Sequence, residues 1–216
     1  WSWIRSETAD VLRWAVGNGA GWKAKYYLAL ILLDRHDDAG ARGLLAACGQ
    51  VPDFAPFYAA RARALEAPSR EESMAALRRA AEMDPGEWRF GKLLADRSIR
   101  DRAFPQALET ASRYARAFPD NYILGMLHAR CLLLSGRFRD AAGALDLVNV
   151  LPYEGSIEGR LLYRHAHLML AVAAQRAGQV EEALRQVGLA REWPEHLGAG
   201  KPYPENVDER IEDWLE

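Results

Sequence analysis

A short pattern recurs along this chain at intervals close to 34 residues. Each copy places a small residue, an apolar or second small residue four positions later, and then a proline or an acidic turn. The five anchor pairs of this pattern are Ala41/Leu45, Ser73/Leu77, Ala107/Ala111, Ala141/Leu145 and Ala183/Val187. Successive first anchors lie 32, 34, 34 and 42 residues apart. A period of this length is typical of helical hairpins that stack on their neighbours.

A second apolar segment lies upstream of each anchor and completes the hairpin. These segments are predicted to be helices over residues 23–33, 57–65, 88–99, 122–134 and 161–177. Proline cannot continue a helix interior, so it ends each unit. The prolines at these boundaries are Pro52, Pro85, Pro119, Pro152 and Pro194. An additional helix over 7–16 comes before the first unit, and we expect Trp1, Ile4 and Trp14 to be partly exposed.

On these residues the chain resembles the tetratricopeptide-repeat family over nearly all of its length. Alanine replaces the family's favoured first-helix glycine at four positions: Ala29, Ala95, Ala129 and Ala171. The favoured turn glycine is kept at Gly136 and Gly178 and is lost near Arg102 and Pro68. The resemblance implies an all-α fold, a right-handed superhelical solenoid of about five hairpins with a C-terminal capping segment.

Five phrases carry a narrower resemblance to the C-terminal repeat region of large bacterial proteins that have an upstream domain of unknown function. They are WKAKYYLAL (22–30), PDFAPFY (52–58), FPDNYI (118–123), NVLPYEG (149–155) and EWPEHLGAGKPYPENVDERIEDWL (192–215). That upstream domain looks related to sugar-binding β-sandwich proteins. The chain would then be the tail of such a protein, which agrees with a sequence that begins Trp-Ser-Trp without a methionine or signal peptide. The resemblance supplies no catalytic residue.

We therefore expect one repeat domain over 1–216, with a leading helix in 1–20, about five repeats in 22–194, a long loop at 150–160 and a cap at 195–216. The 42-residue spacing marks an insertion at this loop. Insertions in helical arrays often lie on the binding face, so Tyr153, Glu154 and Glu158 are candidate ligand contacts. The alternative is that the loop leads into a longer first helix starting near Ile157.

The C-terminal tail is the other departure from the repeat. Residues 207–216 predict a short acidic helix whose apolar positions share one face: Val207, Ile211, Trp214 and Leu215. Terminal repeats need a cap with a polar outside, and this helix fits that role. The alternative is a docking segment for another domain of the parent protein.

Charge and cysteine content limit the partners of the chain. With 28 basic and 30 acidic residues the net charge is −2, which gives no reason to expect nucleic acid or an anionic membrane. No apolar run is long enough to insert into a membrane, so we expect a soluble protein. Cys48 and Cys131 lie in different repeats without metal spacing and predict two buried free thiols. Unpaired cysteines slightly favour the cytoplasm, and the localisation is otherwise open.

In tetratricopeptide arrays the first helix of each hairpin lines a concave groove, which implies a set of candidate binding residues. In register these are Lys23, Tyr26, Leu30, Arg89, Lys92, Asp96, Met126, Arg130, His165, Leu168 and Arg176. Arg89, Lys92, Arg130 and Arg176 would make the groove basic and suited to carboxylates or phosphates. The alternative is that these are surface charges satisfied by nearby Asp and Glu.

The sequence does not match two more specific binding motifs. A two-carboxylate clamp, which some members of the family use for acidic C-termini, is matched by Lys92 but not by Asp96, Leu127, His165 or Met169. His165 and His167 lie about 200° apart around a helix and cannot share a metal ion. The sequence also lacks the motifs of metalloproteases, serine hydrolases and phosphate-binding loops. We expect no catalysis, no metal and no cofactor.

The sequence therefore predicts a non-catalytic scaffold that binds a peptide, a partner protein or another domain of its own chain. The alternative, from the narrower resemblance, is a structural or dimerisation module of a carbohydrate-active enzyme whose catalytic domain lies upstream. Self-association into a homo-oligomer, through the concave face or the first helix, is a third alternative.

Overall fold

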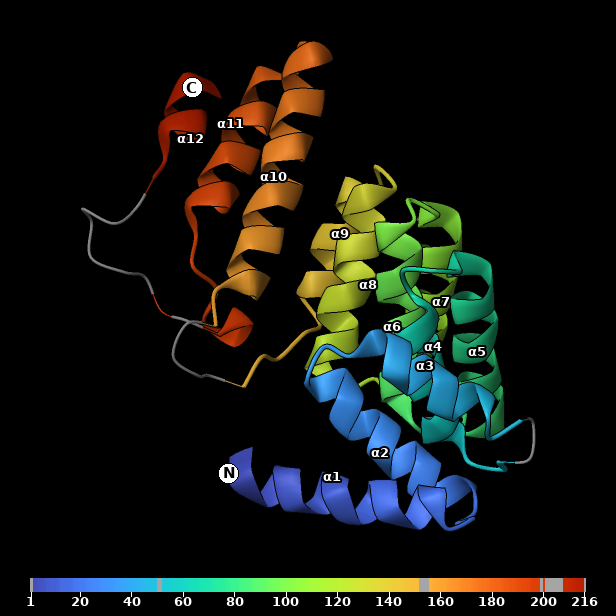
Figure 1. The fold of residues 1–216 in the computed structure, drawn as a ribbon. Helices are drawn as coiled ribbons and strands as arrows, with labels where there is room; N and C mark the ends of the chain where they lie inside the picture. Colours follow the sequence, from blue (N-terminus) through green and yellow to red (C-terminus); the bar gives the residue numbers. More distant parts are fainter. Residues whose placement is uncertain (1, 50–51, 152–155, 199, 201–207, 216) are drawn as a thin grey trace. The chain divides into compact units, whose positions relative to one another are not determined.

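The computed structural model describes residues 2–49, 52–151, 156–198, 200 and 208–215 (Figure 1). Every regular element in these ranges is a helix. In order they are α1 (Ser2–Gly17), α2 (Trp22–Asp34), α3 (Asp38–Ala46), α4 (Ala55–Leu65), α5 (Arg70–Met83), α6 (Trp88–Arg100), α7 (Phe104–Ala117), α8 (Tyr122–Leu134), α9 (Phe138–Leu145), α10 (Glu158–Arg176), α11 (Val180–Arg191), the 3₁₀ turn η1 (Glu195–Leu197) and α12 (Arg210–Leu215). The predicted all-α helical repeat is confirmed. No helix in the described part of the chain has the length and apolarity to span a bilayer.

The contacts divide the chain into two compact units, Trp1–Leu94 and Ala95–Glu216. In the first unit α2 pairs with α3 and α4 pairs with α5, while α1 packs on α2. In the second unit α8 pairs with α9 and α10 with α11, while α7 packs on α8 and α12 on α11. The hairpins follow one another in the order that the repeat predicts. The single domain expected over 1–216 stays a prediction.

The recurring small residues are buried, and core clusters join the two helices of the α2–α3, α4–α5, α8–α9 and α10–α11 hairpins. All ten anchors are buried, from Ala41 and Leu45 in α3 to Ala183 and Val187 in α11. The four alanines that replace the first-helix glycine have 0% of their surface exposed. A methyl group at these positions lets two helices approach closely while their larger neighbours fill the space around them. The repeat in the sequence is therefore a packing repeat.

Local signals fix where several helices begin. The Ser69 side chain accepts a hydrogen bond from the Glu72 N–H at the start of α5, and Asp37 accepts one from Gly40 in α3. The Asn121 side chain accepts from the N–H groups of Ile123 and Leu124 at the start of α8. Such caps satisfy N–H groups that have no partner within the helix.

Four of the hairpin turns, those after α2, α6, α8 and α10, use one residue in the left-handed conformation. Gly136 and Gly178 have φ values of 72° and 71°, as the retained turn glycines predict. The same conformation is taken by His36 at 60° and by Arg102 at 56°, although neither is glycine. A side chain raises the energy of this conformation, so the turn at Arg102 keeps its geometry at a cost.

Replacing Arg102 by glycine should therefore stabilise the protein, by about 0.5–1 kcal/mol, because the relief of backbone strain exceeds the extra entropy of the unfolded chain. The matched reverse change is Gly136→Ala, whose added Cβ meets no atom within 4 Å. It should destabilise by about 1 kcal/mol through the backbone alone. Chemical denaturation of both variants measures the two effects, and a destabilised Arg102→Gly protein would contradict this explanation.

The insertion leads into the long helix α10, which has 19 residues with Ile157 as its N-cap residue. Gly159 lies against η1, since a Cβ at this position would come within 2.8 Å of the Leu197 carbonyl oxygen. The Val150 N–H donates to the His196 carbonyl oxygen at 2.8 Å. Glu158 is exposed in the first turn of α10, whereas Tyr153 and Glu154 lie outside the described residues.

The tail helix α12 packs differently from its apolar pattern. Leu215 is buried, but Ile211 and Trp214 are 52% and 77% exposed, and the fully buried side chain is that of Glu212. The reason is the ion pair that Glu212 makes with Arg164 of α10, at 2.5 Å between Oε1 and Nε. This pair turns the acidic side of α12 toward the array. The fourth apolar position, Val207, lies outside the described residues.

The two predicted free thiols are confirmed as buried. Cys48 lies in the first unit and Cys131 in the second, with 6% and 1% of their surfaces exposed. Burial raises the pKa of both thiols, to about 11 for Cys131. Neither side chain is an ionised nucleophile near neutral pH.

Candidate functional site

An aromatic pocket opens in the first unit between the start of α2 and the turn that precedes α4. Its volume is about 360 Å³. Six residues line it: Trp22, Lys23, Tyr26, Tyr27, Asp53 and Phe54. We refer to this site as the aromatic pocket.

The position of each wall follows from local sequence. Trp22 and Tyr26 are one turn apart at the start of α2, so their side chains lie above one another. On the other side, Phe54 is the N-cap residue of α4 with an extended backbone, and Pro56 follows in the first turn. Proline is favoured in the first turn of a helix, where its missing N–H loses no hydrogen bond, so Pro56 helps to fix the start of α4. The extended backbone of Phe54, just before this start, places its ring against Trp22 and Tyr26 of α2.

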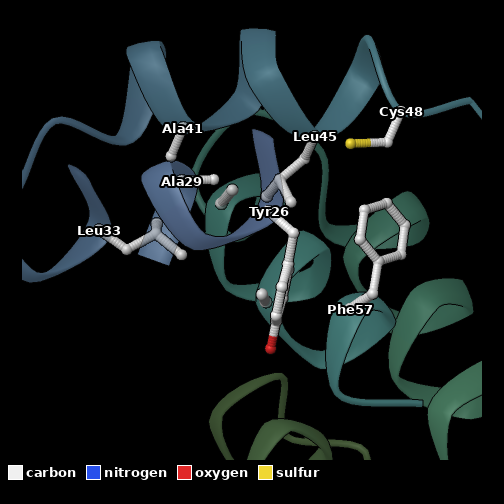
Figure 2. Packing of buried hydrophobic residues seen from close by; sticks show 9 residues of the cluster. Tyr26, Ala29, Leu33, Ala41, Leu45, Cys48 and Phe57 are labelled. Atoms are coloured by element: carbon white, nitrogen blue, oxygen red, sulfur yellow. The ribbon is translucent and has the colours of Figure 1, made fainter. Parts of the chain in front are cut away.

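A packed core, drawn in Figure 2, adjoins the pocket through Tyr26, which belongs to both. Tyr26 of α2 and Phe57 of α4 lie beside each other there, with Leu45 of α3 close to both. The exposed fraction is 6% for Tyr26 and 0% for Phe57. Burial raises the pKa of the Tyr26 hydroxyl, and the neighbouring Tyr27 adds to this. The inner wall is therefore rigid and neutral.

The rings of the pocket pack at inclined angles. The Phe54 ring stands edge-on to Tyr26 at 87° with centroids 5.7 Å apart, and it lies 6.2 Å from the Trp22 ring. Tyr26 and Tyr27 have centroids 5.3 Å apart. Tyr27 and Phe54 keep 53% and 38% of their surfaces exposed. The pocket therefore has a buried aromatic floor and an exposed aromatic rim.

Two opposite charges stand at this rim. The Lys23 ammonium lies 6.0 Å from the Trp22 ring centroid, within reach of a cation–π contact. Neither Lys23 nor Asp53 forms an ion pair or a hydrogen bond with any described residue. One strong donor and one strong acceptor are thus available beside an apolar surface.

Of the residues predicted to line a groove, Lys23 and Tyr26 meet in this pocket. Arg89 instead lies on its own helix start, donating to the Glu87 carboxylate at 3.0 and 3.1 Å and stacking 4.8 Å from the Trp88 ring. For Arg89 the structure therefore agrees with the alternative interpretation given above, in which a nearby carboxylate pairs with the guanidinium charge. Lys92 is half-buried in the same helix and has interaction partners of its own.

The second unit holds other members of the predicted set. Arg130, His165 and Arg176 are exposed, and Asp96 is half-buried and has partners. Met126 is buried at 6% within a core cluster, and Leu168 is buried at 8% in another. Because the predicted groove takes residues from both units, it stays a prediction.

Sequence reasoning missed Trp22, Tyr27, Asp53 and Phe54 as pocket residues. Trp22 does pack on the core cluster, but it also forms one wall of the pocket. A signal was present: both segments of the pocket, 22–30 and 52–58, stand out in the sequence for their aromatic residues. What the sequence did not supply is that these two segments face each other.

The second unit has a hollow at the corresponding turn, of about 550 Å³, before the start of α8. Its lining residues are Ala117, Phe118, Pro119, Asp120, Asn121, Tyr122, Ile123 and Leu151. Asn121 is already used as the cap of α8, and among the described lining residues Asp120 is the only charged one. The hollow has fewer rings and no cation, so the aromatic pocket is the better candidate site.

The fold is shared with several solved structures. The C-terminal part of a tetratricopeptide-repeat protein from Cytophaga hutchinsonii matches with a TM-score of 0.70 at 10% identity, covering 87% of this chain and 73% of that one. YrrB, described as a TPR protein with an unusual peptide-binding site, matches with a TM-score of 0.61 at 14% identity, covering 84% and 91%. The chain has the tetratricopeptide-repeat fold. MamA of AMB-1 is also similar, with a TM-score of 0.57 at 17% identity and coverage of 81% and 92%.

At these identities the likeness defines the tetratricopeptide fold alone. No protein-family model matches the sequence, and no curated protein matches it. Within the described ranges, no group of three or more His, Cys, Asp or Glu side chains is placed to hold a metal ion. What this chain binds must therefore be inferred from its own aromatic pocket and its other surfaces.

Proposed function

We propose that this chain is a non-catalytic scaffold that binds a peptide segment of a protein partner, and that the aromatic pocket receives one apolar side chain of that peptide. The observation that carries the proposal is the combination of four aromatic rings with Lys23 and Asp53 at one rim, neither of which forms an ion pair within the described part of the chain. Concave aromatic surfaces with a few polar groups are typical of binding sites.

The two charges suit a peptide main chain. Peptide carbonyl groups accept hydrogen bonds and N–H groups donate them, so Lys23 can donate to one and Asp53 can accept from the other. The rings would then bury the side chain between these two contacts, as aromatic anchors do at protein interfaces. YrrB, whose fold is similar, is described as having a peptide-binding site, which agrees with this proposal.

Removing one exposed ring of the rim should weaken peptide binding without unfolding the chain. We expect Tyr27→Ala or Phe54→Ala to weaken binding at least tenfold, because such anchors contribute about 2 kcal/mol or more each. The measurement is fluorescence anisotropy with labelled peptides selected from a random library on the wild-type protein. Peptides with Trp, Phe, Leu or Met should be enriched over those with Gly or Asp.

The matched control is Leu147→Ala, which removes a side chain that is 83% exposed in the second unit. It should bind the selected peptides as the wild type does. The proposal is wrong if the folded protein selects no peptide, or if both rim variants keep the wild-type affinity.

A second candidate function, a structural or dimerisation module, is favoured by the surface of α1. Val11 and Trp14 are 65% and 70% exposed on this helix, and large exposed apolar side chains mark contact surfaces when they cluster. Its partner would be a second copy or an upstream domain of a larger bacterial protein. Light scattering of the wild type and of Trp14→Ser tests the first case, and glycoside turnover by a longer parent with and without this segment tests the link to a carbohydrate-active enzyme.

A further inference from the structure

The helix α12 is held on the array mainly by arginines. Arg164 of α10 donates from Nε and Nη2 to the two carboxylate oxygens of Glu212, at 2.5 and 2.6 Å, and from Nη2 to the Asp208 carbonyl oxygen at 3.0 Å. Arg191 of α11 contacts the Asp213 carboxylate at 2.7 Å and that of Glu209 at 3.4 Å. Two arginines from two helices thus hold three carboxylates of one short segment.

Apolar contact contributes little to this docking. Leu215 is the α12 residue in the local core cluster, while Ile211 and Trp214 point into solvent. A helix of six residues is also too short to be stable by itself in water. The segment is therefore ordered chiefly by its charge pairs, which makes its docking comparable to that of a bound peptide.

A third arginine on the same side is not satisfied by α12. Arg160 lies one turn before Arg164 on α10, is 3% exposed, and donates from Nη2 to the Ala190 carbonyl oxygen at 2.7 Å. Its guanidinium carbon lies 4.7 Å from the Trp193 ring centroid. The Nε and Nη1 groups of Arg160 are buried and have no hydrogen-bond partner among the residues that the structure describes, and the same holds for Trp193 Nε1.

Buried hydrogen-bond donors without an acceptor are uncommon in folded proteins, so their presence indicates a place where an acceptor can bind. The carboxylates of Glu209 and Glu212 act on Arg160 through their charge, but neither accepts a hydrogen bond from it. The face formed by Arg160, Arg164 and Arg191, which we name the arginine face, can therefore pair with more anionic oxygen atoms than α12 supplies. Arginine forks are suited to carboxylates in this way.

We propose that the arginine face is a binding site for acidic peptide segments, and that α12 is its resident intramolecular occupant. The ligand class is a short segment with carboxylates in the helical spacing of Glu209, Glu212 and Asp213, followed by an apolar residue at the place of Leu215. A segment with one further carboxylate near Arg160 would pair the donors that α12 leaves open. The site is separate from the aromatic pocket and does not depend on it.

Competition with α12 tests this site. The probe is a fluorescein-labelled peptide with the sequence of residues 208–216, titrated against the full chain and against a chain that ends at residue 207. We expect at least tenfold tighter binding to the shortened chain, because its arginine face is open. Adding Arg164→Glu to the shortened chain should abolish binding, whereas Arg137→Glu, an exposed arginine paired with Asp140 on α9, should leave it unchanged.

A second variant covers the case in which the shortened chain loses its fold. In the full chain, Glu212→Arg together with Asp213→Arg should release α12 by repulsion and open the same face to the unaltered peptide. Circular dichroism establishes which variant is folded. The proposal is overturned if the folded open variant does not bind the peptide, if the full chain binds it equally well, or if Arg164→Glu has no effect.

Discussion

Replacing Phe57 by alanine should lower the free energy of unfolding of the first unit by about 3–5 kcal/mol, the usual range for deleting a buried aromatic ring. Phe57 is 0% exposed at the start of α4. Its ring stands edge-on to Tyr58 with centroids 5.2 Å apart and lies 6.1 Å from that of Tyr26. Without it, the α2–α3 and α4–α5 hairpins lose their central contact, because Tyr26 and Leu45 cannot both move into the space.

Urea denaturation followed by far-UV circular dichroism measures this effect. The matched control is Phe54→Ala, three residues earlier, because Phe54 is 38% exposed on the rim of the aromatic pocket. It should cost about 1 kcal/mol or less, in line with partial burial. Equal losses of stability in the two variants would contradict the assignment of Phe57 to the core.

Replacing Arg164 by leucine should release α12 from the array. Glu212 is 0% exposed, so the change leaves a buried carboxylate without its partner, and such a loss costs about 3–5 kcal/mol. The chain avoids this cost by detaching α12 and exposing Glu212 to water. Amide hydrogen exchange in residues 208–215 should therefore accelerate by about a hundredfold or more, while exchange in α8 should be unchanged.

Two comparisons sharpen this experiment. Arg210→Leu removes the exposed pair with Asp208, whose side chain is 60% exposed, and should change the exchange little because surface ion pairs are weak. The double variant Arg164→Leu/Glu212→Met removes both charges of the pair. It should restore much of the exchange protection of α12, since an apolar pair can replace an ionic one. Undiminished protection in Arg164→Leu would mean that Leu215 alone holds the helix.

The same ion pair makes α12 sensitive to acid. Burial raises the pKa of Glu212, but the hydrogen bonds from Arg164 and the charges of Arg164 and Arg160 outweigh this and leave the pKa below its ordinary value. A lowered pKa stabilises the folded state above the ordinary value of about 4.3, and this stabilisation is lost as pH falls further. Exchange protection of α12 should be constant above about pH 5 and should fall below about pH 4. In Glu212→Gln this dependence should disappear.

The helices could be predicted from the sequence because small residues record where they touch. Each anchor pair places a short side chain at a point of close approach, and any larger residue would separate the helices. The ends of α8 lie at the predicted residues, 122 and 134, because Asn121 caps its start and Gly136 forms the turn after its end. It was harder to predict which face of each helix is buried. The segments that form α2 and α8 are apolar on nearly all sides, so their pattern does not distinguish core from groove, and the predicted groove residue Met126 is buried in a core cluster.

The candidate site could be predicted only in part. Lys23 and Tyr26 follow from their place in the first helix, whereas Asp53 and Phe54 belong to a turn that has no helical period to align. The burial of Glu212 depends on an arginine 48 residues away in the sequence, and no local pattern indicates such a pairing. Acidic residues in a tail are expected to be solvent-exposed, and nothing in the local sequence sets Glu212 apart from its acidic neighbours.

The two buried thiols give the molecule an internal reporter for each unit. Cys48 belongs to the unit Trp1–Leu94 and Cys131 to Ala95–Glu216, and neither is reactive while its unit is closed. Labelling with a thiol reagent would therefore proceed at the rate at which each unit opens. Peptide mapping of the two modified cysteines would give their separate labelling rates without any mutation. Equal rates would indicate that the repeat array opens as a whole, and different rates that its two units open independently.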